Sequence, residues 1–440
     1  MREQTSAGPL IRDRDSRISA VWSALDAAAG PASTLATLAA LVRALSASDY
    51  GILVIALAAS GLSMAVNPAI AATTTKFVSE LSGPLKSGGR TVAGVITISL
   101  IMVALVDLAL FLGAAVFNGR LSVWLFGTGI ARSQQVGHVL LLAVISIGIQ
   151  QIDAVLAAAI RGLERFRRQA LIEIVSKAAL TVVVIYVAWH TRSLEGILLA
   201  QSSIYLLSVF SRGIALRRLL PDKRLFELPA SAETGTLFRY GGWMWLTALA
   251  GVAYTSADRV IIGRSLGAAA AGQYNIYVQI IQLIHFVPSS VFAFSFPAFS
   301  RLASQGSTRN REIAKSYRSY LLAVSVSALG IASAMMVFWP FILRILAGSS
   351  FGDGRLGAPG LLTLNFFLLA CNVAPYYLLL ALGHARSVSM ITTLSMLAAL
   401  ALMALLIPRY GLEGAALARL AYGVGSLILL QRAHYVLKRT

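Results

Sequence analysis

Several polar side chains interrupt the long apolar stretches of this sequence, and their chemistry suits binding better than bond cleavage. Gln279, Gln282 and His285 recur at three-residue spacing, which places them on one slowly drifting face of a helix. Amide and imidazole groups both donate and accept hydrogen bonds. This face therefore suits either the lining of a polar cleft or hydrogen bonds to neighbouring helices.

Four ionisable residues of the apolar stretches are candidates for ion coupling. Glu173 and Lys177 lie four residues apart, so they can neutralise each other on one helix face as a packing pair. Asp107 and Asp153 are acids at membrane depth, where carboxylates often relay protons. Asp153 can equally pair with Arg161, which follows about two helical turns later.

Cations in or beside the apolar stretches suit an anionic ligand. Arg419 is the strongest candidate, because Glu413 is the only obvious acid near it in the sequence. Arg43, Arg259 and Arg264 lie at the ends of apolar stretches, and arginine can hold phosphate oxygens in a bidentate fork. For Arg43 and Arg264 the alternative role is to anchor a helix end at the lipid headgroups.

Enzyme and metal-site motifs are absent from the sequence. It contains no Gly-x-x-x-x-Gly-Lys-Ser/Thr phosphate loop and no His-Glu-x-x-His, and its five histidines are scattered. Cys371 is the only cysteine, which excludes an intramolecular disulfide and a cysteine-cluster metal site. We therefore expect neither an enzyme nor a bound cofactor.

The elements that must position these side chains are membrane-spanning helices. Of 440 residues, 57% are hydrophobic and 12% are charged, about half the charged share of a soluble domain. Only helices or closed barrels cross lipid, and the apolar segments lack the alternation of barrel strands. The sequence thus predicts an all-α polytopic membrane protein with twelve spans. Their cores are Ile18 to Leu41, Gly51 to Ala72, Thr91 to Phe117, Val136 to Ile160, Ala170 to Trp189, Leu194 to Leu216, Tyr240 to Ala257, Tyr274 to Phe299, Ser319 to Leu343, Ala358 to Leu382, Val388 to Ile407 and Leu412 to Leu430.

Lysine and arginine are distributed unevenly between the two sides of the membrane. If the N-terminus is cytoplasmic, 26 of the 37 fall on the inner side and nine fall in or beside the outer loops. By the positive-inside rule this bias predicts that both termini are cytoplasmic. Topology and anionic headgroups account for the net charge of +19, so no nucleic-acid partner is expected.

The two halves of the chain repeat one another. One constant offset in residue number aligns pairs of Trp, Arg and Gly: Trp22 with Trp243, Arg43 with Arg264, and Gly51 with Gly272. A three-residue deletion then lowers the offset, which aligns LEGILLAQ from Leu194 with LEGAALAR from Leu412. Because six helices return the chain to its starting side, the repeats are parallel and related by a pseudo-two-fold axis along the membrane normal. We expect six-helix lobes at 1–216 and 240–440, joined by a cytoplasmic linker at 217–239.

The opening helix of each half is unusually polar. WSALDAAAGPAST begins at Trp22 and WMWLTALAGVAYTSADR begins at Trp243, and they contain Asp26, Tyr254 and Asp258. In transporters built from repeats, corresponding polar segments point to the substrate site, so we expect both helices to line a cleft. Close packing is the alternative explanation for their small residues, although it does not explain Asp26.

The sequence also resembles a known family. GRSLGAAAAGQYNIYVQIIQLIHFVPSSVFAFSFPAFSRLAS, VRALSASDYGILVIA and AIRGLERFRRQALIEIVSKAAL resemble polysaccharide-biosynthesis transport proteins of the multidrug/oligosaccharidyl-lipid/polysaccharide exporter superfamily. The resemblance covers nearly the whole chain. The first half departs from the pattern, since Ser46 stands where glycine is usual and Tyr50 precedes Gly51.

This resemblance implies a flippase that moves an undecaprenyl-diphosphate-linked oligosaccharide to the periplasmic leaflet of a bacterial inner membrane. The resemblance also implies partners, namely membrane lipids and a polysaccharide polymerase with other assembly proteins. The candidate substrate groups are cations for the diphosphate and hydrogen-bonding groups for the sugars, namely Arg43, Lys177, Arg259, Arg264, Arg419, Gln279, Gln282 and His285.

Two other functions remain open from the sequence. A cation-coupled multidrug exporter of the same superfamily shares the architecture, but it would need an aromatic and acidic cavity rather than a basic one. A scaffold of a polysaccharide-assembly complex would not need the polar opening helices.

Overall fold

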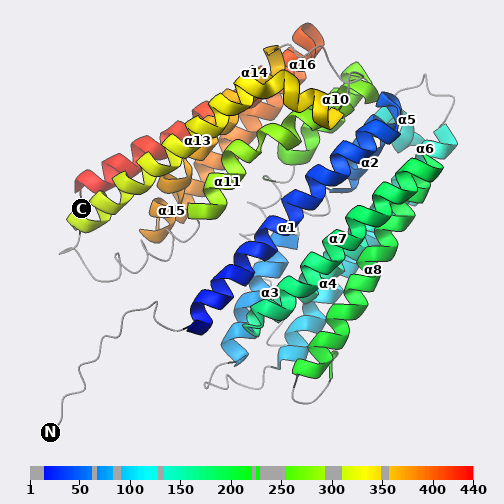
Figure 1. Ribbon diagram of the computed structural model, residues 1–440, viewed down its shortest axis with the longest axis horizontal. Helices are drawn as coiled ribbons and strands as arrows, with labels where there is room; N and C mark the ends of the chain where they lie inside the picture. Colours follow the sequence, from blue (N-terminus) through cyan, green and yellow to red (C-terminus); the bar gives the residue numbers. More distant parts are fainter. Residues whose placement is uncertain are drawn as a thin grey trace.

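Every regular element in the described part of the chain is a helix. This computed structural model describes residues 14–61, 67–82, 91–126, 133–220, 224–227, 251, 254–292, 310–347 and 356–439. In Figure 1 the helices form two bundles that converge at one end of the molecule and diverge toward the end where the C-terminus lies. An all-α fold is therefore confirmed for these ranges.

The two bundles follow each other along the chain. The first bundle contains α1 (Arg14–Ala44), α2 (Ala47–Ser60), α3 (Asn67–Ser82), α4 (Val92–Val116), α5 (Asn118–Phe126), α6 (Ser133–Gly162), α7 (Phe166–Thr191) and α8 (Leu194–Leu219). The second bundle contains a helix at residues 254–266, α10 (Ala268–Ile281), α11 (Leu283–Phe292), α13 (Asn310–Ala347), α14 (Gly357–Cys371), α15 (Val373–Ala381) and α16 (Ala385–Arg439).

Seven helical stretches of the described residues are long and apolar enough to cross a membrane. Some predicted spans are divided, since α10 and α11 meet at a turn at Gln282, and α14 and α15 meet at Asn372. By contrast, α16 covers both the eleventh and twelfth predicted spans, with a non-helical Gly411 (φ 56°, ψ −134°) between them. The chain is thus a multi-pass membrane protein, while the count of twelve spans stays a prediction.

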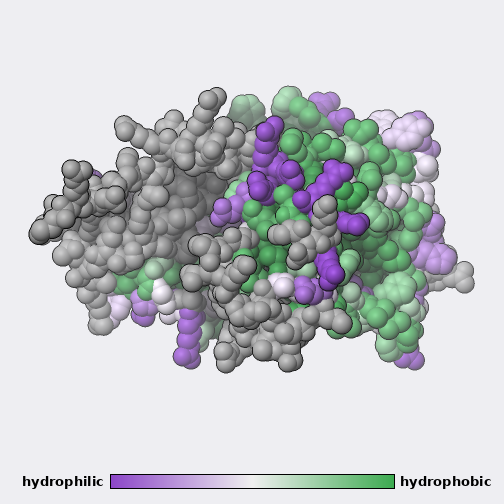
Figure 2. All heavy atoms as spheres, turned by 90° about the horizontal axis from the view of Figure 1, so that it is seen from below, coloured by the Kyte–Doolittle hydropathy of each residue, from purple (hydrophilic) through white to green (hydrophobic). Residues whose placement is uncertain are grey.

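The described surface is apolar enough to face lipid. Figure 2 shows hydrophobic side chains over much of the described surface on one face of the molecule. Large apolar side chains are exposed on helices of both bundles, including Leu105, Val182, Phe210, Val337 and Leu405. In a membrane these groups contact acyl chains, so their exposure needs no partner protein.

Most of the predicted linker at 217–239 lies outside the described residues. In the described segment 224–227, Glu227 lies against the start of α4. The Thr91 hydroxyl donates to the Glu227 carboxylate at 2.6 Å, and the Glu227 amide donates to the Thr97 hydroxyl at 3.1 Å. The lobe and linker boundaries remain predictions.

Helices α2 and α10 begin at positions that the repeat aligns, but by different means. Ser46 precedes α2 with an extended backbone, and its hydroxyl accepts a hydrogen bond from the Asp49 amide at 3.1 Å. Gly267 precedes α10 with a φ of 91°, which favours glycine because it has no Cβ. A side-chain cap therefore explains why serine replaces the glycine that the resemblance led us to expect at position 46.

The backbones of α2 and α10 touch where the two bundles converge. A Cβ atom added to Gly51 would lie 1.7 Å from the carbonyl oxygen of Ala268. One added to Gly272 would lie 3.2 Å from the Gly51 Cα. The two glycines that the repeat aligns thus face each other across the bundle interface.

The buried cores follow the same division. One apolar core crosses the convergent end and includes Ile55 of α2, Ile276 of α10 and Trp339 of α13. Away from it, a core around Ile96 lies within the first bundle, and another around Tyr317 lies within the second. The bundles therefore share a core at one end and have separate cores toward the other.

Candidate functional site

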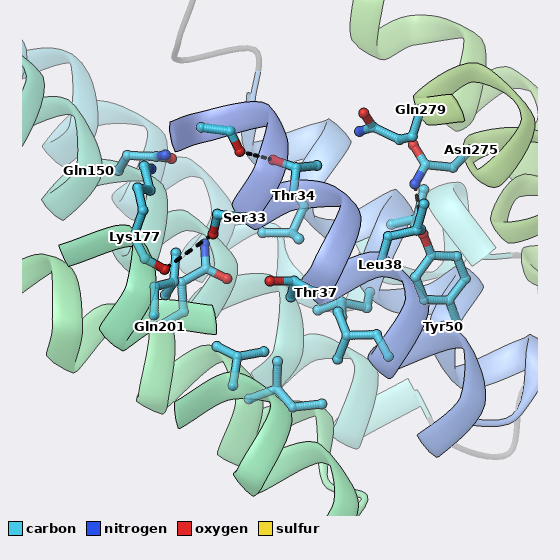
Figure 3. A pocket seen from close by; sticks show the side chains of 18 of the residues that line it. Ser33, Thr34, Thr37, Leu38, Tyr50, Gln150, Lys177, Gln201, Asn275 and Gln279 are labelled. Atoms are coloured by element: carbon cyan, nitrogen blue, oxygen red, sulfur yellow. Dashed lines mark hydrogen bonds between the residues drawn. The ribbon is translucent and has the colours of Figure 1, made fainter. Parts of the chain in front are cut away.

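A cavity of about 270 Å³ lies beside α1, lined by polar and apolar side chains of the first bundle and by two residues of α10. Figure 3 shows Gln150, Lys177 and Gln201 on one side of α1 and Asn275 and Gln279 of α10 on the other. The described lining contains five hydroxyl groups, four amides and one ammonium group, and none of these residues is Asp or Glu. They are Ser33, Thr34, Thr37, Tyr50, Tyr205, Gln150, Gln201, Asn275, Gln279 and Lys177.

Hydrogen bonds between helices fix the wall of this cavity. The Ser33 hydroxyl of α1 lies 2.7 Å from the Thr181 hydroxyl and donates to the Lys177 carbonyl at 3.3 Å, which ties α1 to α7. The Tyr205 hydroxyl of α8 accepts from the Gln150 amide at 2.8 Å and from the Lys177 ammonium at 3.3 Å. Two polar groups of the wall, the Gln150 amide and the Lys177 ammonium, thus converge at one phenol oxygen.

A cluster of four charged residues lies next to the cavity wall. Arg212 forms ion pairs with Asp153 and with Glu173, and its side chain is 1% exposed. It also donates to the Gln169 side chain at 3.2 Å and to the Ser208 hydroxyl at 2.8 Å. Lys177 lies 3.7 Å from Glu173. With two cations and two carboxylates the cluster is neutral, as burial requires.

Asp107 lies apart from this cluster. Its carboxylate, on α4, accepts a hydrogen bond from the Gln151 side chain of α6, and neither residue is among the described residues that line the cavity. Its partner is a neutral amide, whereas Asp153 and Glu173 each face a cation.

A second buried charge cluster lies in the second bundle. Arg419 of α16 forms an ion pair with Asp258, whose side chain is fully buried. The Arg419 guanidinium lies over the Tyr254 ring at 4.6 Å and near the Phe366 ring at 5.4 Å. Arg259 lies 3.2 Å from the same aspartate. The carboxylate therefore sits between two arginines.

This cluster is connected to the first bundle by side-chain hydrogen bonds. Arg259 donates to the Asn275 side-chain oxygen at 2.8 Å, and the Asn275 amide donates to the Tyr50 hydroxyl at 2.8 Å. Tyr50 belongs to α2, so the chain of contacts crosses the bundle interface beside Gly51.

Arg43 and Arg264 each contact the opposite bundle. Arg43 donates to the carbonyl of Ile345 in α13, and Arg264 lies 5.0 Å from the centre of the Trp124 ring in α5. Trp124 and Ile345 are themselves aligned by the offset that aligns the two arginines. The two arginines thus make related contacts at corresponding positions, and both are exposed at the convergent end.

Comparison with known proteins decides the family. Residues 34–303 match the polysaccharide biosynthesis protein family, which is more than half of the chain. The chain belongs to the polysaccharide biosynthesis protein family. This places it in a family of transporters rather than among enzymes. A provisionally named O-antigen transporter of Shigella flexneri is 23% identical over 195 residues, and that match spans 44% of this chain and 46% of the relative.

Solved structures share the fold of this family member. An inward-facing multidrug resistance transporter of the MATE family, in the MOP superfamily, aligns over 93% of this chain and 96% of its own, with a TM-score of 0.78 and 12% identity. The inward closed lipid II flippase MurJ aligns over 95% of this chain and 87% of its own, with a TM-score of 0.71 and 14% identity. At these identities the likeness establishes the fold alone.

The predicted polar face of the eighth span is divided in this family member. Gln279 lines the cavity, whereas Gln282 lies at the turn between α10 and α11 and donates to the Gln279 side chain. His285 lies beyond the turn in α11 and is half-buried. A turn changes the direction of the side chains that follow it, so the three residues do not form one straight face.

Sequence reasoning found some contacts of this transporter and missed others. The Glu173–Lys177 pair lies as its spacing indicates. Asp153 pairs with Arg212 rather than with Arg161, and the sequence did not indicate this contact because no local pattern links residues on two separate helices. Asp26 lies in α1, but its side chain is outside the described part of the structure.

Proposed function

We propose that this protein moves an undecaprenyl-diphosphate-linked oligosaccharide from the cytoplasmic to the periplasmic leaflet of a bacterial inner membrane. The observation that carries the proposal is the cavity along α1, whose described lining offers hydroxyls, amides and Lys177 without a carboxylate. Neutral donors and acceptors suit sugar hydroxyls, and a cation suits a diphosphate. The family supports a cargo used in polysaccharide synthesis.

The transport cycle is alternating access between two lobes of six spans. Two bundles that touch at the α2–α10 crossing and have separate apolar cores away from it support this cycle. Arg43, Arg264 and Arg259 are the proposed cationic groups beyond the cavity, with Asp26, Gln282 and His285 as further cleft candidates. Tyr254, Asp258 and Arg419, also expected in the cleft, are buried against one another, so their proposed role is to support the second bundle's side of it.

Drug export is the weaker proposal for this cavity. A cationic drug would favour carboxylates, yet the acids nearest the described cavity already face Arg212 or Lys177. The same pairing argues against ion coupling through Asp153, Glu173 and Lys177. Asp107 is the remaining candidate for coupling, since its carboxylate accepts from the neutral amide of Gln151.

Deletion of the gene followed by lipid extraction tests the proposal. Lipid-linked oligosaccharide should accumulate on the cytoplasmic leaflet, where an impermeant glycan-modifying enzyme added to spheroplasts cannot reach it. Complementation with the parent sequence should restore labelling from outside. A deletion strain with no such accumulation would contradict the proposal, and a strain that instead becomes sensitive to cationic drugs would favour the exporter.

Membrane topology gives a separate prediction. A reporter enzyme fused after Arg224 should be active only in the cytoplasm, and one fused after Arg132 or Asp353 only in the periplasm. The reason is the excess of Lys and Arg in the predicted inner segments. Periplasmic activity of the Arg224 fusion would contradict the predicted arrangement of six spans after a cytoplasmic N-terminus, and with it the count of twelve.

Arg43 and Arg264, the two arginines at the convergent end, give a further prediction. We expect the double change Arg43→Lys and Arg264→Lys to leave membrane insertion normal while glycan export falls roughly tenfold, because lysine cannot bind phosphate oxygens in a bidentate fork. Immunoblots and surface-glycan assays measure the two effects. Arg120→Lys, on an exposed residue of α5, is the matched control. Unchanged export would assign both arginines to anchoring the helix ends or the bundle contact.

A further inference from the structure

The cavity in the first bundle lies at positions that the duplication repeats in the second. Ser33 and Thr37 of α1 and Gln201 of α8 all line it. The offset that aligns Arg43 with Arg264 carries the first two onto Tyr254 and Asp258. Gln201 ends the stretch LEGILLAQ, and Arg419 ends the matching stretch LEGAALAR. Each bundle therefore places a corresponding set of three residues between its opening helix and its last helix.

The second bundle has filled this position with its own side chains. Arg419 forms an ion pair with Asp258 and lies 4.6 Å from the centre of the Tyr254 ring. The three residues are buried, at 3%, 0% and 2% exposure respectively. The large side chains that replace Ser33, Thr37 and Gln201 thus pack against one another.

In the first bundle the corresponding position, at Ser33, Thr37 and Gln201, is a cavity. Serine is much smaller than tyrosine and glutamine is smaller than arginine, while threonine and aspartate are similar in size. The hydroxyl and amide groups at positions 33, 37 and 201 carry no charge. Lys177 is balanced by Glu173 at 3.7 Å. A nearly neutral cavity with hydroxyl and amide groups among apolar side chains suits an uncharged sugar, whose hydroxyl groups both donate and accept hydrogen bonds and whose ring faces pack on apolar groups.

We propose that this cavity is the transporter's glycan subsite, that it holds one neutral sugar residue of the cargo, and that the Asp258–Arg419 pair closes the equivalent subsite of the second bundle. This inference rests on the proposed flippase function. A volume of about 270 Å³ is near the lower end of small-ligand pockets, so the subsite takes a part of the oligosaccharide and not the whole. Thr37, Gln201 and Gln150 are the hydrogen-bonding residues.

Grafting the second bundle's pair into the first bundle tests the closure. Thr37→Asp with Gln201→Arg should fill the cavity with a mutually neutral pair. Protein level should then stay near that of the parent, while export falls about tenfold or more. If this double variant folds normally and exports glycan at the rate of the parent protein, the proposal is overturned.

Milder variants guard against misfolding of the graft. Thr37→Val and Gln201→Met keep the approximate shape but remove hydrogen bonds, each of which contributes about a fivefold effect, so the pair should weaken export roughly tenfold or more. Ser203→Val is the matched control on α8, because Ser203 is exposed and its hydroxyl donates to the Leu199 carbonyl of the same helix. Equal export by the double variant and the control would contradict the role of these groups.

Direct binding is measured by protection of a cysteine. Cys371 is the only cysteine in the sequence, so Cys371→Ser provides a cysteine-free background for Thr37→Cys and, as control, Arg120→Cys on an exposed residue of α5. The probe is the lipid-linked oligosaccharide extracted from the deletion strain. It should slow the reaction of Thr37→Cys with a water-soluble thiol reagent, by about fivefold or more at saturation, and leave the reaction of Arg120→Cys unchanged.

The outcomes separate the two proposals. If the deletion strain accumulates the lipid-linked oligosaccharide but that lipid does not protect Thr37→Cys, the subsite proposal is wrong and the flippase proposal stands. If no such lipid accumulates, both are overturned.

Discussion

Asp258→Asn is expected to remove most of the folded protein from the membrane. The substitution leaves the Arg419 guanidinium buried against Tyr254 without the carboxylate that it contacts. Arginine stays protonated in proteins, so its charge cannot be relieved. Breaking a buried ion pair on one side costs about 3 to 5 kcal/mol, a large part of the stability of many proteins. Protein level and thermal stability in detergent, measured by fluorescence-detected size exclusion, would report the loss.

The repeated sequence supplies a compensating variant. Asp258→Thr together with Arg419→Gln introduces the residue types of Thr37 and Gln201, which the first bundle accommodates between the two corresponding helices. We expect this double variant to recover at least half of the level that Asp258→Asn loses, since it removes both charges at once. A double variant as unstable as the single one would show that the two residues do not act as a pair.

Gly51→Ala is expected to open the convergent end rather than to unfold the protein. The new Cβ would lie 1.7 Å from the Ala268 carbonyl oxygen. Rotation of a side chain cannot relieve this clash, because the Cβ atom and the carbonyl oxygen are both attached directly to the backbone. Separating α2 from α10 removes the clash. A cost of about 3 kcal/mol or more for the closed contact would shift the population of closed and open states by over 100-fold.

Spin labels on the two bundles measure this change. Arg120→Cys on α5 and Leu356→Cys directly before α14, in a Cys371→Ser background, place one label on an exposed residue of each bundle. Their distance should lengthen in Gly51→Ala. Gly113→Ala is the matched control, because a Cβ at Gly113 in α4 meets nothing within 4 Å. An unchanged distance in folded Gly51→Ala would mean that the crossing is not the contact that closes the transporter.

The amino-acid sequence alone determined that the protein lies in lipid, that its fold is all-α and that its two halves correspond to each other. Long apolar segments with few charges cannot leave backbone groups unpaired in lipid, so they had to be helices. The repeat register predicted that Gly51 and Gly272 are equivalent, and α2 and α10 indeed start and end at aligned positions. The Glu173–Lys177 contact was also readable, because one helical turn brings those residues together.

Tertiary structure alone decided which equivalent residues meet and what surrounds them. The register aligns Gln201 with Arg419, but it does not reveal that Arg419 pairs with Asp258 on a distant helix or that Gln201 borders a cavity. Arg212 similarly reaches Asp153 from another helix. Periodicity reports which face of one helix a residue occupies, whereas a buried ion pair or an enclosed cavity depends on how several helices pack together. The polar cavity of the first bundle, and its replacement by a charge pair in the second, therefore became visible only in the folded chain.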